Sequence, residues 1–259
     1  MPRRVIAFPC EGATLFGTLD EARGDTGLLI VSGGNEIRIG AHRGMAWLAA
    51  EVSTAGYPVL RYDRRGIGDS EGENGGFASA GPDLAAAIAA FREQGVTRIV
   101  AFGNCDAASM LALNGGVDAV ILANPWVIEA TDDLPPAAAI RARYAERLRD
   151  PAEWRRLMTG GVDMAKLARG VGRLVPRRSA GASLAVRIAA GLKAFDAPIT
   201  VLLAERDNTA IAFADAWRAP IFATLRERAR VETLPSASHS FASAEDQLWL
   251  REKILAALA

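Results

Sequence analysis

Residues 98–110 of the chain read Arg-Ile-Val-Ala-Phe-Gly-Asn-Cys-Asp-Ala-Ala-Ser-Met. An apolar run typical of a β-strand ends at Gly103, and after a cysteine at position 105 small residues lead into a helix-compatible segment, Ala107–Asn114. The sharp turn of a nucleophile elbow needs small residues on both sides, and Gly103 and Ala107 meet that need. The usual pattern is G-x-S-x-G, whereas this one is G-x-C-x-A. The stretch therefore predicts an elbow with Cys105 as its nucleophile.

A thiol at this position would lie at the N-terminus of a helix, where unpaired N–H groups and the helix dipole favour a thiolate. The alternative is a small buried hydrophobic residue, which is the commonest role of a free cysteine. The other cysteine, Cys10, is far away in the sequence and is predicted to be structural. Two such cysteines indicate no disulfide framework, and they favour a reducing compartment.

Composition limits the classes of protein to consider. The chain has 259 residues, of which 50% are hydrophobic, and this suits one α/β domain with an insertion. The formal net charge is zero, so nothing in it indicates a nucleic-acid partner. The N-terminal apolar run is broken by Pro9 and Glu11, and no apolar run is long enough to span a bilayer. We expect a cytoplasmic protein with no integral membrane segment, and a homo-oligomer stays open.

Strand-like runs alternate with helix-like segments on both sides of the elbow. This alternation is typical of a doubly wound, mostly parallel sheet, here of eight strands, with a site at the carboxyl ends of the strands. The predicted strands outside the elbow are Val5–Phe8, Ala13–Leu19, Gly27–Val31, Pro58–Tyr62, Val117–Ala123, Pro198–Leu203 and Val231–Leu234. The predicted helices are His42–Ala55, Asp83–Phe91 and Ala244–Leu258, and the segment Thr209–Arg228 is predicted to be largely helical.

The alternation stops between residues 127 and 195, in a segment rich in arginine. We predict an inserted helical cap at 127–195, with helices at Ile140–Leu148 and Ala152–Leu157, and a core formed by 1–126 and 196–259. If some of these arginines face the cleft, they would favour an anionic acyl substrate. The alternative is a solvated helix surface with salt bridges.

Three chemically active side chains follow predicted strands: Cys105, Asp207 and His239. An imidazole can take the proton of a thiol, and a carboxylate can hold that imidazole in one tautomer. Asp207 could instead cap the helix that follows it, and His239 could be a solvated loop residue. Asp63, which also follows a strand, is the competing acid. The second histidine, His42, is predicted to be structural or adjacent to the substrate.

Acyl chemistry also needs backbone N–H groups that stabilise an oxyanion. Candidates are Asp106, directly after the nucleophile, and Gly34 or Asn35 in the glycine-rich turn after an earlier strand. Trp126 follows another strand and either lines the substrate pocket or packs in the core. The sequence contains no metal-ligand cluster and no cofactor motif, so neither a metal nor a cofactor is predicted.

Residues 63–70 read Asp-Arg-Arg-Gly-Ile-Gly-Asp-Ser and match the pattern D-x-R-G-x-G-x-S, which the α/β-hydrolase superfamily commonly carries in the loop before the elbow. Together with the elbow and the C-terminal histidine, this pattern makes the chain resemble that superfamily over nearly its whole length. The resemblance implies the α/β-hydrolase fold and the chain order nucleophile, acid, histidine.

A narrower resemblance rests on Gly33–Arg43 and Gly103–Ser109. These stretches are similar to the first of two hydrolases associated with the exosortase A system, which also use cysteine at the elbow. That family occurs in Gram-negative bacteria that export exopolysaccharide and sort proteins by a C-terminal signal, so the resemblance implies a genomic link to export. It supplies no substrate. Dienelactone hydrolases are also similar in their elbow cysteine, but they have glycine where this chain has Ala107.

The sequence thus predicts cleavage of an ester or thioester through a cysteine acyl-enzyme, with a small-molecule acyl substrate. Two other classes stay open. The same acyl-enzyme could pass its acyl group to an alcohol or an amine, as in an acyltransferase. A non-catalytic binding protein could also retain the hydrolase fold.

Overall fold

The computed structural model of the chain describes residues 2–128 and 182–259. One eight-stranded sheet runs through them in the order β1-β2-β4-β3-β5-β6-β7-β8. β2 pairs antiparallel with both of its neighbours, and all other pairs are parallel. This confirms the predicted mostly parallel sheet of eight strands. The strands are β1 (Arg3–Cys10), β2 (Ala13–Asp20), β3 (Thr26–Val31), β4 (Val59–Tyr62), β5 (Arg98–Asn104), β6 (Ala119–Ala123), β7 (Ile199–Ala204) and β8 (Arg230–Leu234).

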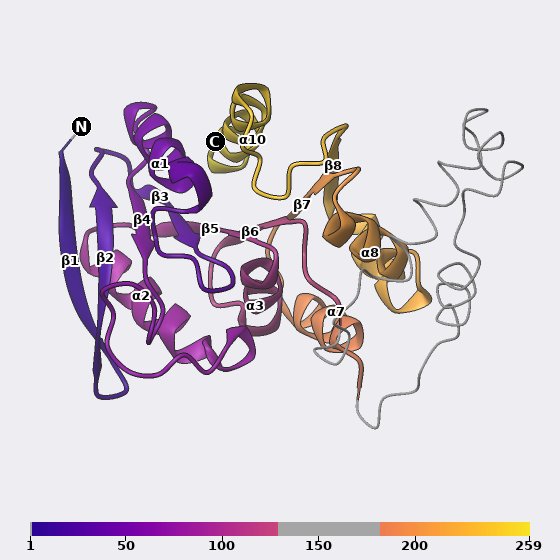
Figure 1. The fold of residues 1–259 in the computed structure, drawn as a ribbon, viewed down its shortest axis with the longest axis horizontal. Helices are drawn as coiled ribbons and strands as arrows, with labels where there is room; N and C mark the ends of the chain where they lie inside the picture. The colour runs from indigo at the N-terminus through magenta and orange to yellow at the C-terminus, as the bar shows by residue number, and fades with distance from the viewer. Residues whose placement is uncertain (1, 129–181) are drawn as a thin grey trace, which may run out of the picture.

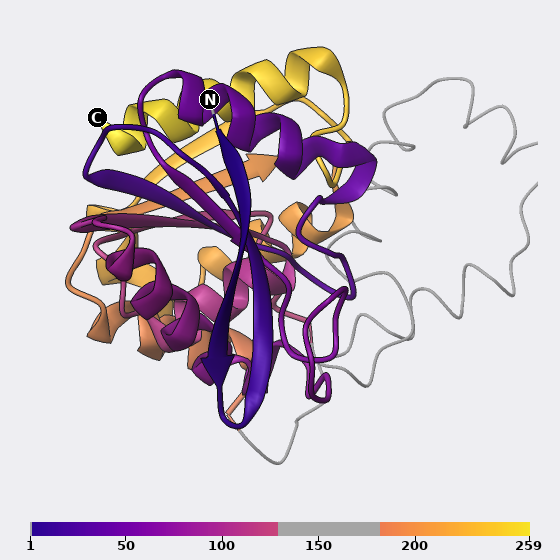
Figure 2. The same ribbon diagram turned by 90° about the vertical axis from the view of Figure 1, so that its left-hand side faces the viewer.

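Helices cover both faces of this sheet (Figures 1 and 2). On one face lie α1 (Gly44–Thr54) and α10 (Ala244–Leu258). On the other face lie α2 (Gly81–Glu93), α3 (Asp106–Asn114), α7 (Leu184–Ala194), α8 (Asn208–Trp217) and α9 (Ala223–Arg228). Short 3₁₀ turns form η1 (Ala41–Arg43), η2 (Phe77–Ser79) and η3 (Pro220–Phe222).

The central strand β3 is apolar from Gly27 to Val31 because both of its faces are covered. In β3, Leu28 and Ile30 pack with α1 and α10, while Leu29 and Val31 belong to the core on the opposite face. All four side chains are at most 2% exposed. Successive side chains of a strand point to opposite faces, so a strand buried on both sides shows no alternation in its sequence.

Two predicted helical segments differ in detail from the observed helices. The segment Thr209–Arg228 is largely helical, as predicted, and it is divided into α8, η3 and α9 because Pro220 cannot continue a helix and Ala219 before it is extended. The helix predicted from His42 begins at Gly44, because the backbone of His42 and Arg43 has positive φ.

Most of the predicted cap, including its two predicted helices, lies outside the described residues. The described end of that segment, α7, packs against α3, and its Ile188 and Leu192 are part of the core cluster. The division of the chain at residue 195 stays a prediction. Within 2–128 and 182–259, no helix is both long enough and apolar enough to cross a bilayer.

Candidate active site

Cys105 occupies a sharp turn between β5 and α3. Its backbone has φ 60° and ψ −124°, a conformation that residues other than glycine rarely adopt. The Cys105 N–H donates to the carbonyl of Ala123 at 2.9 Å, which ties the turn to β6. A Cβ on Gly103 would lie 2.7 Å from the Ala107 carbonyl carbon, so glycine is required where the strand passes under the helix. Local backbone geometry thus presents the thiol beyond the carboxyl end of the sheet.

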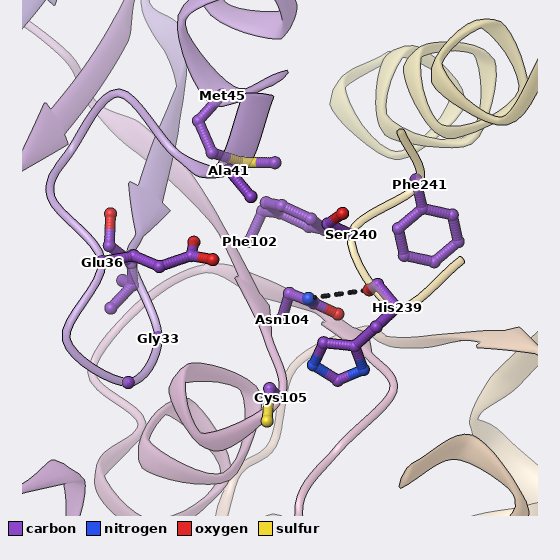
Figure 3. Close-up of a pocket in the computed structure, with 13 residues that line it drawn as sticks. Gly33, Glu36, Ala41, Met45, Phe102, Asn104, Cys105, His239, Ser240 and Phe241 are labelled. Atoms are coloured by element: carbon purple, nitrogen blue, oxygen red, sulfur yellow. Dashed lines mark hydrogen bonds between the residues drawn. The ribbon is translucent and has the colours of Figure 1, made fainter. Parts of the chain in front are cut away.

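The thiol lies at a pocket of about 140 Å³ (Figure 3). In this view the Cys105 sulfur and the imidazole ring of His239 lie on the same side of Asn104. The pocket is lined by residues of β3 and the turn after it, of η1, α1 and β5, of the elbow, and of the loop that carries His239: Val31, Ser32, Gly33, Gly34, Glu36, Ala41, Met45, Phe102, Asn104, Cys105, His239, Ser240 and Phe241.

His239 pairs with Asp207, which follows β7. The distance between His239 Nδ1 and Asp207 Oδ2 is 3.1 Å. The same oxygen accepts the N–H groups of Thr209 at 3.1 Å and Ala210 at 3.0 Å, and so it caps α8. The structural and the functional interpretations of Asp207 are therefore compatible, since one carboxylate begins a helix and holds an imidazole.

The imidazole has an altered acidity. Its hydrogen bond to Asp207, and next the neighbouring Cys105 side chain, raise the pKa of His239 to about 10, against the opposing effect of burial. A protonated imidazole beside the sulfur can supply a proton to a departing group.

Two asparagines that the sequence analysis missed hold the loop of His239. The side-chain N–H groups of Asn104 and Asn124 donate to the carbonyl of His239 at 3.0 and 3.2 Å. Asn124 Oδ1 also accepts the N–H of Ala204 at 2.9 Å, which ties the end of β7 to the same point. A signal was present in the sequence, because Asn104 ends β5 and Asn124 follows β6, at neighbouring carboxyl ends of parallel strands.

Neither Asp63, the competing acid, nor His42 lines the pocket. Asp63 is fully buried, and its carboxylate accepts the N–H groups of Arg38 and Asp69 and pairs with the Arg38 guanidinium. These partners hold its loop rather than His239. His42 is exposed in η1 and does not line the pocket, although its neighbour Ala41 does.

The predicted oxyanion donors differ in their position relative to the pocket. Gly34 lines the pocket, but its N–H donates to the Asp106 carboxylate at 2.7 Å. Asn35 does not line the pocket, and its side chain accepts a hydrogen bond from Asn74. Asp106 is the first residue of α3. The first N–H groups of a helix have no acceptor within the helix, and the backbone N–H of Asp106 is one of them.

Trp126 is tied to the elbow rather than to the pocket. The backbone N–H of Trp126 donates to the Cys105 carbonyl at 3.1 Å, and the backbone carbonyl of Trp126 accepts a hydrogen bond from the Ser109 hydroxyl at 2.5 Å. The side chain packs against the core cluster and is not among the residues that line this pocket. Met45 and Phe241, which do line it, were not predicted, because their apolar side chains fit a core equally well.

The site can be compared with known proteins. A model of the family described as "Alpha/beta hydrolase family" matches residues 28–249. The fold is similar to that of an esterase from Pyrococcus furiosus, with a TM-score of 0.66, 14% identity, and coverage of 98% of this chain and 88% of that one. A thioesterase domain from the curacin biosynthetic pathway has a TM-score of 0.62 and 12% identity, with 98% and 100% of the two chains covered.

A hydrolase from Pseudomonas aeruginosa is 24% identical, with a TM-score of 0.58 and 97% of each chain covered. No curated protein matches the chain. At these identities the structural likeness concerns the fold, whereas the family model covers far more than half of the sequence. On that match, the chain is a member of the alpha/beta hydrolase family.

Proposed function

We propose that the chain cleaves an ester or thioester through an acyl-enzyme on Cys105, with His239 as its proton carrier and Asp207 as the group that orients His239. The observation that carries this proposal is the 3.1 Å pair of Asp207 and His239 beside a cysteine held in an elbow. The esterase and thioesterase folds to which the chain is similar support the same reaction class.

In the proposed first step, Cys105 Sγ attacks the acyl carbonyl carbon. A C–S bond forms to the enzyme, the bond to the leaving alcohol or thiol breaks, and the leaving group takes the proton held on His239. Water then attacks the enzyme thioester and gives a proton to His239, and the acid departs as the C–S bond breaks. The sulfur is then left beside the protonated His239, which returns the site to its starting state.

Intact-protein mass measured after brief incubation with p-nitrophenyl acetate tests this proposal. We expect an acetyl adduct on the parent, none on Cys105→Ala, and slow formation on His239→Ala. Cys10→Ala is the matched control, because it removes the other cysteine, which is buried at the end of β1. An adduct that survives in Cys105→Ala would favour a binding protein with the hydrolase fold, and so would the absence of an adduct from the parent and from variants at Asp106 alike.

Acyl transfer begins from the same intermediate, so adduct formation alone does not separate it from hydrolysis. Product analysis with water alone, and then with added alcohols and amines, makes the distinction. Free acid as the main product in every mixture supports hydrolysis. An ester or amide of the added acceptor as the main product would assign the chain to acyl transfer.

Two finer features of the substrate follow from the sequence. The arginine-rich segment would favour an anionic acyl group if its side chains face the pocket, and rates with a succinyl and a butyryl thioester test this. Equal rates would mean that those arginines form a solvated surface. The resemblance to the exosortase-associated hydrolase would place the acyl group in exopolysaccharide or protein export, which the mass of a Cys105 adduct isolated from the native host can test.

A further inference from the structure

The Asp106 side chain reaches from the elbow to the glycine turn after β3. Its Oδ1 atom lies 2.7 Å from the Gly34 nitrogen. A Cβ on Gly33 would lie 2.6 Å from the same oxygen and 2.8 Å from the Asn104 carbonyl oxygen. Glycine at position 33 therefore permits the contact, in which the residue after the nucleophile occupies a backbone donor that lines the pocket.

Arg64 holds the other side of this turn. The side chain is buried, with 2% of the residue exposed, and its Nη2 donates to the Gly34 carbonyl. Its Nη1 is buried without a hydrogen-bond partner, and within the described part of the chain it forms no ion pair. A buried guanidinium is costly unless it keeps its polar contacts. A shift of the turn would break the contact with Gly34, so the Asp106 side chain is the part that is free to move.

The occupied donor matters for acyl chemistry because attack on a carbonyl creates an oxyanion. The loss of one N–H donor in an oxyanion hole typically costs about 10²–10³ in rate. Here the Gly34 N–H is engaged by a carboxylate, which also adds a like charge close to the developing oxyanion.

We propose that Asp106 is a specificity-determining gate on the oxyanion hole. The carbonyl oxygen of a substrate has to displace the Asp106 carboxylate from the Gly34 N–H before two backbone donors can stabilise the oxyanion. This inference rests on the proposed function. Substrates that bind through additional contacts can offset the displacement, whereas small esters and thioesters without such contacts react slowly.

Two reagents for the same sulfur separate the gate from other effects on the thiol. Iodoacetamide alkylates a thiolate by displacement and forms no oxyanion, whereas p-nitrophenyl acetate acylates it through one. The ratio of the acylation to the alkylation rate constant therefore reports oxyanion stabilisation after correction for thiolate reactivity. The ratio is measured by intact-protein mass for the parent, Asp106→Ala and Asp106→Asn.

The matched control is Asp118→Ala. The Asp118 carboxylate likewise accepts one backbone N–H, from Ile99 at 2.7 Å, but at the opposite end of β5. We expect the ratio to rise about tenfold or more in Asp106→Ala and by a smaller factor in Asp106→Asn, and to stay at the parent value in the control. If Asp106→Ala does not fold, the Asn variant decides, because it removes the charge and keeps the shape.

A ratio that falls in Asp106→Ala and returns to the parent value in Asp106→Asn would make the side chain a structural strut and overturn the gate. An unchanged ratio in both variants would overturn it as well. If the parent and all variants are alkylated but none is acylated, the proposed function itself fails. Acylation of Asp106→Ala alone would support the gate and the proposed function together.

Discussion

At the level of single side chains, Asp207 combines two duties that can be separated by substitution. Asn caps a helix about as well as Asp, whereas Ala does not, and a lost cap costs about 1 kcal/mol. We therefore expect Asp207→Asn to keep nearly the parent free energy of unfolding and Asp207→Ala to lose about 1 kcal/mol. Acylation should fall by about 10²–10⁴ in both variants, because neither holds the imidazole as a carboxylate does.

Urea denaturation and acylation rates of the two variants check this prediction. Equal losses of stability would mean that the cap is unimportant, and a normal acylation rate in Asp207→Asn would remove Asp207 from the proposed mechanism.

The raised pKa of His239 predicts a pH dependence with a definite sign. Because the pKa is raised to about 10, the imidazole keeps its proton through neutral pH and loses it as the pH rises through about 10. Cleavage of an alkyl ester should decline there, because the alkoxide leaving group needs that proton. Asp207→Asn removes the largest cause of the shift, so the decline should move to lower pH.

The measurement is the pH profile of ester cleavage, corrected for the uncatalysed reaction. A p-nitrophenyl ester is the control, since its leaving group departs without a proton and should show no such decline. An alkyl-ester profile that is the same in parent and Asp207→Asn would contradict this role of the pair.

At the level of secondary-structure elements, the elbow depends on the close passage of β5 under α3. Gly103→Ala puts a methyl group 2.7–2.8 Å from backbone atoms of Ala107 and Ala108, which cannot move aside as a flexible side chain could. We expect a loss of about 1–3 kcal/mol in stability, as for overpacking in a core, together with a displaced thiol.

Gly44→Ala is the matched control, because Gly44 begins α1 with open space around a new Cβ. It should leave the protein as stable or more stable by about 0.5–1 kcal/mol. Thermal unfolding of both variants checks the pair, and equal losses would show that the effect at Gly103 is not steric.

The sequence predicted these elements well where local chemistry decides the structure. The runs at Gly27–Val31 and Ile99–Gly103 are apolar throughout because each strand is covered on both faces, and Gly103 and Ala107 follow from the turn itself. The break at Pro220 could also have been read, since proline cannot continue a helix. The contact between Asp106 and Gly34 could not, because it joins two turns that are 72 residues apart.

For the molecule as a whole, substitutions in α7 can test whether this helix, which precedes the predicted cap boundary at residue 195, unfolds together with the core. Leu192 is 1% exposed in the core cluster and packs on the same face as α3. Leu192→Ala should cost about 2–5 kcal/mol and lower the denaturant midpoint of one cooperative transition, with an unchanged slope. Val186 of α7 is 40% exposed, and Val186→Ala should change stability by less than about 0.5 kcal/mol.

A separate early transition in Leu192→Ala would mean that α7 unfolds independently of the sheet. The cap boundary at residue 195 was inferred because the strand–helix alternation stops, and this criterion cannot tell a helix of the core from a helix of an insertion. Three-dimensional packing supplies that distinction, and the buried face of α7 does not differ in sequence from the buried face of any amphipathic helix.

The positive φ of Cys105 has one more consequence, for the balance between stability and reactivity. A side chain in such a backbone conformation costs about 1–3 kcal/mol, and glycine avoids most of that cost. Cys105→Gly should therefore be free of most of this backbone strain. Its melting temperature should be higher than that of the parent and that of Cys105→Ala. Because Cys105→Gly lacks the thiol and is more stable, it would be the variant in which to crystallise the protein with an uncleaved substrate.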